Sequence, residues 1–319
     1  MVKSEVKERR QITRKRKLIN FALVGIIGIG SGLFLGSWYS SLRQSNPINY
    51  SQYTEETLKD DINDAFFKAI GIKNPTNSEK ENWVETAKSR GITPQNLTAA
   101  ENFMLAEYNL GLANSYSAIG TGKVAVMGTS QSIYSAKMFD GNTYTFESIS
   151  KGILTVADCL VMEKGASTIT KIKGENVSST SASWTGSKST MTTIECKENN
   201  GGTPDKVIPY IISSKTILSG STISANETNG KTYYTYTISL DPVKSVINYV
   251  KQVKQTSGLN DFPEFNNISI TIVLDENWNL CKFNSEENYR VRYGMFNPEC
   301  KGTLNLNFTI NEPVTLPKV

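Results

Sequence analysis

The sequence of 319 residues contains no histidine. Without an imidazole, the chain cannot form a Ser-His or Cys-His nucleophile pair, and it lacks the commonest zinc ligand. Cysteine is scarce as well, with four residues and no Cys-x-x-Cys spacing, so a zinc site that needs all four thiolates is disfavoured. We therefore expect no cofactor and assign no catalytic residue, and an enzyme is not the favoured interpretation.

The excess of positive over negative charge is confined to the amino terminus. Residues 1–17 carry eight Lys or Arg residues against two Glu residues, while the rest of the chain holds 26 basic and 28 acidic residues. The large carboxy-terminal part therefore has no overall attraction for nucleic-acid phosphates, and we expect no nucleic-acid partner.

A long apolar stretch follows this basic tail. Residues 18–42 hold 25 uncharged residues, and about 20 apolar residues suffice for a helix to cross a bilayer. Trp38 and Tyr39 lie at the far end, where aromatic rings favour the membrane interface, and the basic tail favours the cytoplasm. The pattern predicts a single transmembrane helix with an extracytoplasmic carboxy-terminal domain. The alternative is a cleavable signal peptide, although no A-x-A site follows the stretch.

The same stretch carries glycines at every fourth position. Gly28, Gly32 and Gly36 would form a smooth groove on one helix face, at which two chains could form a homodimer. The alternative is that glycine is simply common in membrane helices.

Residues 43–53 are polar and predict a linker, and residues 54–117 predict a small helical module. The first of its three helices is expected to be capped by Thr54 and to end at Gly71. The second and third are expected to begin with capping boxes, Ser78 with Glu81 and Thr98 with Glu101. Residues 118–319 change to a period of two, which is typical of antiparallel strands, and Asp241 and Pro242 open one further helix over 242–257. The polar run 178–193 is interpreted as a hairpin or a loop. The predicted fold class is α+β: a curved antiparallel sheet with a packed helix.

The four cysteines, Cys159, Cys196, Cys281 and Cys300, all follow the predicted span. An oxidising compartment would favour two disulfides, and proximity in sequence favours 159 with 196 and 281 with 300. Two other connectivities, and four free thiols in a reducing compartment, stay open.

Two local patterns indicate chemistry. Asp275, Asn277, Asn279 and Glu286 match positions 1, 3, 5 and 12 of an EF-hand loop, but Leu280 replaces its glycine, and a plain hairpin turn explains the same residues. Ser148 and Lys151 match the Ser-x-x-Lys pattern of some hydrolases, without its partner motifs. The remaining candidates are carboxylates that could form an acid–base pair, namely Asp158, Asp241, Glu264 and Glu287.

Residues 234–308 also carry a family resemblance. They read TYTISLDPVKSVINYV, then NNISITIVLDENWNLCKFNSEENYRV, then CKGTLNLNF: a strand, a helix opened by Asp-Pro, and three further strands. This run resembles the carboxy-terminal part of extracytoplasmic half-barrel proteins of the LolA and LppX type, and of membrane-anchored Firmicutes proteins. The resemblance implies a strongly curved sheet that faces inserted helices and shelters acyl chains or another apolar ligand.

On that basis, alternate side chains of two strands and one helix stripe would line an apolar cradle. These residues are Tyr234, Tyr236, Ile238, Val246, Val250, Val253, Ile268, Ile270, Ile272 and Leu274. The alternative is that they meet in a dry core. The leading functional hypothesis is a binding domain for a lipid-like ligand. The second is a structural or adhesive ectodomain, and the third is a Ser-Lys or carboxylate hydrolase.

Overall fold

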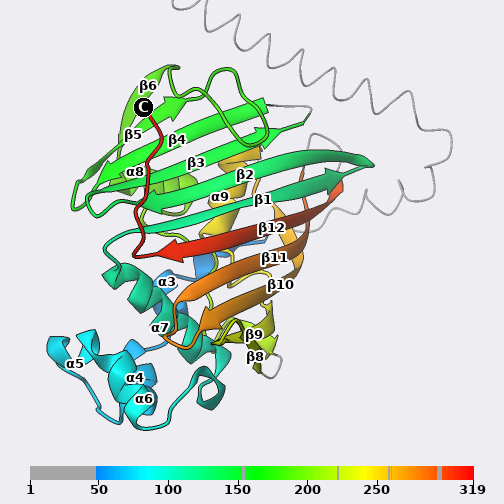
Figure 1. Ribbon diagram of the computed structural model, residues 1–319. Helices are drawn as coiled ribbons and strands as arrows, with labels where there is room; N and C mark the ends of the chain where they lie inside the picture. Colours follow the sequence, from blue (N-terminus) through cyan, green and yellow to red (C-terminus); the bar gives the residue numbers. More distant parts are fainter. Residues whose placement is uncertain (1–47, 153–154, 221–222, 258, 260, 293–296) are drawn as a thin grey trace, which may run out of the picture. The chain divides into compact units, whose positions relative to one another are not determined.

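The computed structural model describes residues 48–152, 155–220, 223–257, 259, 261–292 and 297–319 (Figure 1). The chain divides into the units Met1–Asn46 and Pro47–Val319, and every described residue belongs to the second. The predicted basic tail, the membrane span 18–42 and its glycine groove lie outside the described residues. Among the helices that are described, none has the length and apolar character needed to cross a bilayer.

The helical module is built from short helices. Their bounds are η1 Tyr50–Gln52, α3 Glu55–Leu58, α4 Ile62–Ile70, α5 Asn77–Glu81, α6 Trp83–Ser89, η2 Pro94–Asn96 and α7 Ala99–Leu112. The Thr98–Glu101 capping box of α7 is confirmed. The predicted helix between Thr54 and Gly71 is wrong as one element, because the Asp61 side chain accepts the Asn63 N–H and starts a new helix.

Two further sequence predictions in this module need correction. The second helix is capped by Thr76 with Glu79, two residues before the predicted pair Ser78 and Glu81. In addition, part of the predicted linker 43–53 belongs to the folded core. Tyr50 is 6% exposed, and its hydroxyl donates to the Pro263 carbonyl oxygen at 2.7 Å.

The twelve strands of the described residues form one antiparallel sheet, as the α+β prediction required. Their bounds are β1 Tyr116–Val126, β2 Thr129–Phe139, β3 Thr143–Lys151, β4 Thr155–Glu163, β5 Thr168–Lys173, β6 Lys188–Thr192, β7 Ile217–Gly220, β8 Ser224–Thr228, β9 Lys231–Leu240, β10 Glu264–Asp275, β11 Leu280–Arg290 and β12 Glu299–Ile310. The order is β6-β5-β4-β3-β2-β1-β12-β11-β10-β9-β7, with β8 also paired to β9. The pairing of β1 with β12 joins the first and last strands of the sheet in its middle (Figure 1).

This central pairing depends on a close approach of two backbones. A Cβ atom added to Gly120 of β1 would lie 1.7 Å from the Asn305 carbonyl oxygen of β12, and one added to Gly122 would lie 2.0 Å from that of Thr303. Backbone atoms in a paired strand cannot move aside as a flexible side chain can. Glycine is therefore required at both positions, because a Cβ atom would collide with the backbone of β12.

We expect Gly120→Ala to destabilise the fold by about 2 kcal/mol, the usual cost of overpacking, in equilibrium unfolding by urea. Gly111→Ala is the matched control. A Cβ atom at Gly111 in α7 meets nothing within 4 Å, so the same substitution should be neutral or slightly stabilising there. A Gly120→Ala chain as stable as the native protein would contradict the close-approach explanation.

One face of the sheet carries the main core, and we call it the covered face. It presents Ile270, Phe283 and Leu306, which are 0–4% exposed. Helices α7 and α9 (Tyr249–Ser257) pack over it together with residues 201–216, the strap, which form neither helix nor strand. The strap inserts the apolar side chains Val207, Ile208, Tyr210, Ile211 and Ile212 into this core, at 1–5% exposure.

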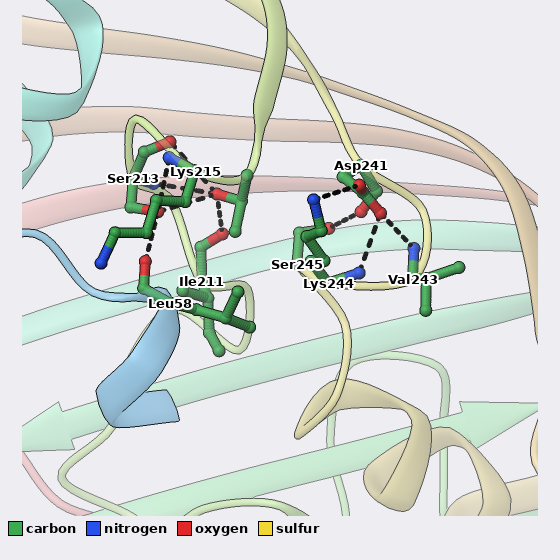
Figure 2. Close-up of polar contacts among 9 residues, drawn as sticks. Leu58, Ile211, Ser213, Lys215, Asp241, Val243, Lys244 and Ser245 are labelled. Carbon is green, nitrogen blue, oxygen red and sulfur yellow. Dashed lines mark hydrogen bonds and ion pairs between the residues drawn. The ribbon is translucent and has the colours of Figure 1, made fainter. Parts of the chain in front are cut away.

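The far end of the strap is held by buried polar contacts (Figure 2). The Ser213 hydroxyl donates to the Leu58 carbonyl oxygen at 2.6 Å, and the Thr216 hydroxyl donates to the Ile211 carbonyl oxygen at 2.7 Å. These bonds satisfy backbone carbonyl groups that would otherwise be buried without partners. The Ser213–Leu58 bond ties the strap to the end of α3, and the Thr216–Ile211 bond lies within the strap.

The predicted helix 242–257 begins late, at Tyr249. Asp241 is the cap that the sequence predicted, because its carboxylate accepts the Val243 and Lys244 N–H groups at 2.9 Å each (Figure 2). The Ser245 carbonyl oxygen, however, accepts the Ile211 N–H of the strap at 2.8 Å. Residues 242–248 therefore form turns, and the α-helix covers 249–257.

The opposite face of the sheet has its own small core under the polar run 178–193. Trp184 is 5% exposed and packs against Ile149 and Ile172. Its indole N–H donates to the Glu147 carboxylate at 2.6 Å. Residues 178–187 of the run form a loop with one isolated bridge, between Glu175 and Ser183, and residues 188–192 form β6, which pairs with β5.

Candidate functional site

The predicted cradle residues are all buried, and they meet one another on the covered face. Tyr234, Tyr236 and Ile238 of β9 pair with Leu274, Ile272 and Ile270 of β10. The helix-side residues Val246, Val250 and Val253 are 0–7% exposed and belong to the same core as Ile268. In this conformation α7, α9 and the strap pack directly on these side chains. A ligand site along the whole length of the predicted cradle therefore stays a prediction.

Open space lies at one end of this layer. A cavity of about 200 Å³ is formed where η1, the carboxy-terminal end of α9, the start of β10 and the segment that follows β11 meet. Its apolar walls are Ile48, Tyr50 and Phe262, and we call it the Tyr50–Phe262 cavity. Lys254 also lines it and directly follows Val253, whose side chain faces the core, so the cavity adjoins the covered face beside α9.

The aromatic walls of this cavity are fixed by specific contacts. The Tyr50 and Phe262 rings meet edge to face, with centroids 5.9 Å apart. Burial is the main cause that raises the pKa of Tyr50 well above its ordinary value, so this phenol stays protonated and keeps its bond to the Pro263 carbonyl oxygen. Phe262 is 39% exposed and presents ring surface to the opening.

The rim of the cavity carries charges of both signs in equal number. Lys254 and Arg292 are its cations, and Asp261 and Glu264 are its carboxylates. The Lys254 ammonium lies 4.6 Å from the centroid of the Phe262 ring, and Arg292 Nη1 lies 4.0 Å from Asp261 Oδ2. The rim therefore has no net charge, although it carries two positive and two negative side chains.

Aromatic rings lead inward from the cavity to a buried carboxyl group. Phe265 follows the rim residue Glu264 by one position, and its ring centroid is 5.6 Å from that of Tyr249, which is 4.9 Å from that of Tyr210. The Tyr210 and Tyr249 hydroxyls donate to the Glu287 carboxylate at 2.6 and 3.1 Å. Glu287 therefore connects β11 to both the strap and α9.

Glu287 is an unusual group for a core. It is 6% exposed, and burial raises its pKa from 4.5 to about 7, against the opposing effect of the two tyrosine hydrogen bonds. No ion pair involves Glu287 in the described part of the chain. Below pH 7 the neutral acid is therefore the main form of Glu287 in the folded chain.

A buried lysine holds the strap from the other half of the sheet. Lys137 of β2 is 8% exposed, and its ammonium donates to the Lys206 carbonyl oxygen of the strap at 2.5 Å. Burial, followed by the charge of Lys206, lowers the pKa of Lys137 to about 7. The adjoining pocket holds about 20 Å³, room for one water molecule, so it is no ligand site.

The predicted metal ligands do not converge. The Asp275 carboxylate accepts the backbone N–H groups of Asn277 and Asn279 at 2.8 Å each, which makes it the organiser of the β10–β11 turn. Glu286 pairs with Ser269, six residues back along β10, or roughly 20 Å from Asp275 at the usual rise of a strand. Among the described residues, no group of three or more acidic or cysteine side chains could hold a metal ion.

The predicted disulfides are wrong, because all four cysteines are free. Cys159 packs on one face of β4 with Ile172, whereas Cys196 packs against Leu160 on the other face. Cys300 pairs with Tyr289, eight residues along β11 from Cys281, or roughly 26 Å away. A disulfide needs Cα atoms within about 7 Å, so 281 and 300 are too far apart to pair, and the sheet separates the thiols of 159 and 196.

The Ser148–Lys151 pair is not assembled either. The two residues are three positions apart in β3, so their side chains point to opposite faces of the sheet. Among the carboxylates considered from the sequence, Asp158 forms an ion pair with Lys171 at 2.8 Å, and Asp241 caps its turn. Of these four carboxylates, Glu264 lines the cavity, and Glu287 is bonded to Tyr210 and Tyr249 in the core.

Sequence reasoning missed several residues that organise this region. Trp278 is fully buried, and its indole N–H donates at 2.7 Å to Asn102 of α7, which fixes the helical module to the β10–β11 turn. Lys137 and Tyr210 were also missed. A lysine at a buried position of an alternating strand is a detectable signal, but Tyr210 lies in a segment with no periodicity at all.

No family model matches this chain, and no curated protein sequence does. Among solved structures, the chain is similar to LprF from Mycobacterium bovis, with a TM-score of 0.33, 11% identity, and 69% of this chain and 96% of that one covered. It is also similar to the lipoprotein LppX from Mycobacterium tuberculosis, with a TM-score of 0.27, 12% identity and coverages of 66% and 96%. A third similar structure is a DUF1329 family protein from Desulfovibrio piger, with a TM-score of 0.19 and 7% identity. The match covers 66% of this chain and 90% of that one.

These neighbours include the LppX type that residues 234–308 resemble. Because all three TM-scores lie below 0.5, they assign no function to this chain.

Proposed function

We propose that the domain beyond the apolar stretch binds a lipid-like ligand, which enters through the Tyr50–Phe262 cavity and contacts the covered face beside α9. The observation that carries this proposal is the cavity itself, about 200 Å³ of space with aromatic and aliphatic walls next to a large apolar core. Ligand sites in proteins are typically concave and mostly apolar, with a few polar groups that set orientation. The four charged residues of the rim supply such groups.

The size of the cavity suggests how much of a ligand it takes. Sites that enclose a drug-sized molecule have volumes of roughly 300–1,000 Å³, so the Tyr50–Phe262 cavity holds a part of a lipid rather than all of it. Helix α9 presents Val250 and Val253 to the covered face, and an apolar tail could separate this helix from β10. The tail would then lie on the predicted cradle residues nearest the cavity.

The proposed location is outside the cytoplasmic membrane, with the chain held by residues 18–42. The basic tail and the uncharged stretch of the sequence support this orientation. Protease added to intact cells should then remove the part of the chain beyond residue 53. Full protection of that part would contradict the orientation.

The binding proposal is tested by filling the cavity. Radiolabelled dodecanol is dialysed to equilibrium against the full-length chain held in an amphipathic polymer, with native protein, Ile48→Trp and Leu218→Trp compared at equal concentration. Ile48 lines the cavity, whereas Leu218 is 65% exposed on β7 and does not line it. Uptake into the polymer cancels in the comparison.

We expect Ile48→Trp to weaken dodecanol binding at least tenfold, because the indole occupies the space that the tail needs. Leu218→Trp should bind as the native chain does. Equal binding by all three proteins, or no binding by the native chain, would contradict the proposed function.

A further inference from the structure

We propose that the Tyr50–Phe262 cavity selects a zwitterionic head group, with one anionic and one cationic centre, such as a phosphocholine or phosphoethanolamine ester. This inference rests on the proposed function, because it names the head group of the lipid-like ligand that the cavity would take. It is carried by the pairing of aromatic surface with two cations and two carboxylates around one opening.

The charges of the rim come from different segments and lie around the same space. Lys254 is contributed by α9 and Arg292 by the segment that follows β11, while Asp261 and Glu264 flank the Phe262 ring in sequence. The Arg292–Asp261 contact is long, at 4.0 Å, and these side chains are 36% and 52% exposed. An ion pair of this kind contributes little to stability, so a ligand can exchange with it at small cost.

A ligand with one charge would be poorly matched to this rim. An anion that contacts Lys254 and Arg292 also meets two carboxylates, and a cation that contacts Asp261 and Glu264 also meets two basic groups. Repulsion of this kind is an effective source of selectivity, because it acts against the wrong ligand. A zwitterion satisfies both pairs at once.

The aromatic walls add a second preference. A quaternary or primary ammonium is attracted to the face of an aromatic ring, and the Phe262 ring already holds the Lys254 ammonium at 4.6 Å from its centroid. The phosphate of a head group would draw Lys254 toward itself as a charge-assisted partner. The ring face released in this way is then available to the cationic end of the same head group.

The test uses probes that share a dodecyl tail and differ only in the head: dodecylphosphocholine, dodecyl phosphate, dodecyltrimethylammonium and dodecanol, each below its micelle concentration. Binding to the full-length chain in amphipathic polymer is measured by equilibrium dialysis. The chain variants are native, Lys254→Met, Asp261→Asn and the control Lys80→Met. Lys80 also lies over an aromatic ring, 5.7 Å from the centroid of Phe66, but it belongs to α5 of the helical module and does not line the cavity.

We expect the native chain and Lys80→Met to bind dodecylphosphocholine at least tenfold more tightly than dodecyl phosphate or dodecyltrimethylammonium, whose heads carry charge of one sign only. Lys254→Met leaves the rim with an excess negative charge, so its preference should shift toward dodecyltrimethylammonium. Asp261→Asn leaves an excess positive charge and should shift the preference toward dodecyl phosphate. Opposite shifts from two substitutions at one cavity cannot arise from a general loss of folding.

Equal affinity for the charged probes in the native chain, or the same change for all probes in both variants, would overturn the head-group inference while dodecanol binding still supports the proposed function. No binding of any dodecyl probe would overturn both. Phosphocholine without a tail is the last arm. If it binds as tightly as dodecylphosphocholine, the zwitterion site stands and the apolar-ligand proposal fails.

Discussion

Lys137→Met should make the fold more stable at pH 6 than the native chain, and this advantage should disappear as the pH rises toward 10. The cause is the buried ammonium of β2, whose pKa is lowered from 10.5 to about 7 mainly by burial. Between these two values the unfolded chain binds the proton and the folded chain does not, so native stability rises with pH there.

The expected size of the effect follows from the slope of the unfolding free energy against pH. Each pH unit between 7 and 10 is worth about 1.4 kcal/mol, so the native chain should gain about 4 kcal/mol relative to Lys137→Met across that range. The substitution also leaves the Lys206 carbonyl oxygen without its donor, at a cost of about 1–3 kcal/mol that does not depend on pH. Methionine should therefore be favourable in mild acid and unfavourable near pH 10.

The measurement is urea unfolding at a series of pH values, with Lys123→Met as the control, since Lys123 is an exposed lysine of the neighbouring strand β1. A pH-independent difference between Lys137→Met and the native chain would show that the Lys137 ammonium is not destabilised by burial.

Glu287→Gln should behave in the opposite sense. Burial raises the pKa of Glu287 from 4.5 to about 7, so between these values the folded chain binds the proton that the unfolded chain releases, and native stability falls as the pH rises. Glutamine carries no charge at any pH and can still hydrogen-bond with Tyr210 and Tyr249. The variant should match the native chain near pH 4.5 and exceed its stability by about 3 kcal/mol at pH 8.

The control for this prediction is Glu286→Gln, which removes an exposed carboxylate from the adjacent position on the opposite face of β11. Glu286→Gln should leave the dependence of the unfolding free energy on pH as it is in the native chain. A Glu287→Gln chain whose stability tracks that of the native protein from pH 4.5 to 8 would contradict the account of Glu287 as a neutral acid that links the sheet to its cover.

Local features of the fold were predictable from the sequence, because their causes are local. The alternation in 268–274 placed four side chains on a buried face, and all are fully buried. The second helix shows the limit of such reasoning. The run Thr76-Asn77-Ser78-Glu79-Lys80-Glu81 contains two overlapping capping boxes, and nothing in the local pattern decides that Thr76 with Glu79 forms the cap.

Features that depend on distant contacts could not be predicted. The pairing of β1 with β12 joins residues almost 200 positions apart, and it is permitted by the missing side chain of Gly120. The strap has no periodicity, so its place in the core is set by contacts such as Tyr210 with Glu287. The expected disulfides failed for the same reason, because proximity in sequence says nothing about the face of a strand.

The candidate site was only partly predictable. The cradle residues beside it were recognised from their spacing, but the walls of the Tyr50–Phe262 cavity come from η1, α9, the start of β10 and the segment that follows β11. These segments share no motif, and Tyr50 lies in a stretch whose composition is typical of a linker. A cavity formed by four unrelated segments is visible only once the chain is folded.

Native mass spectrometry of the full-length chain, purified from its membranes in an amphipathic polymer, tests the central claim most directly. The proposed function predicts one lipid-like molecule retained per native chain, and its loss from Ile48→Trp purified in parallel. A native chain that carries no such molecule, or an Ile48→Trp chain that carries it equally, would contradict the claim that the Tyr50–Phe262 cavity is a ligand site.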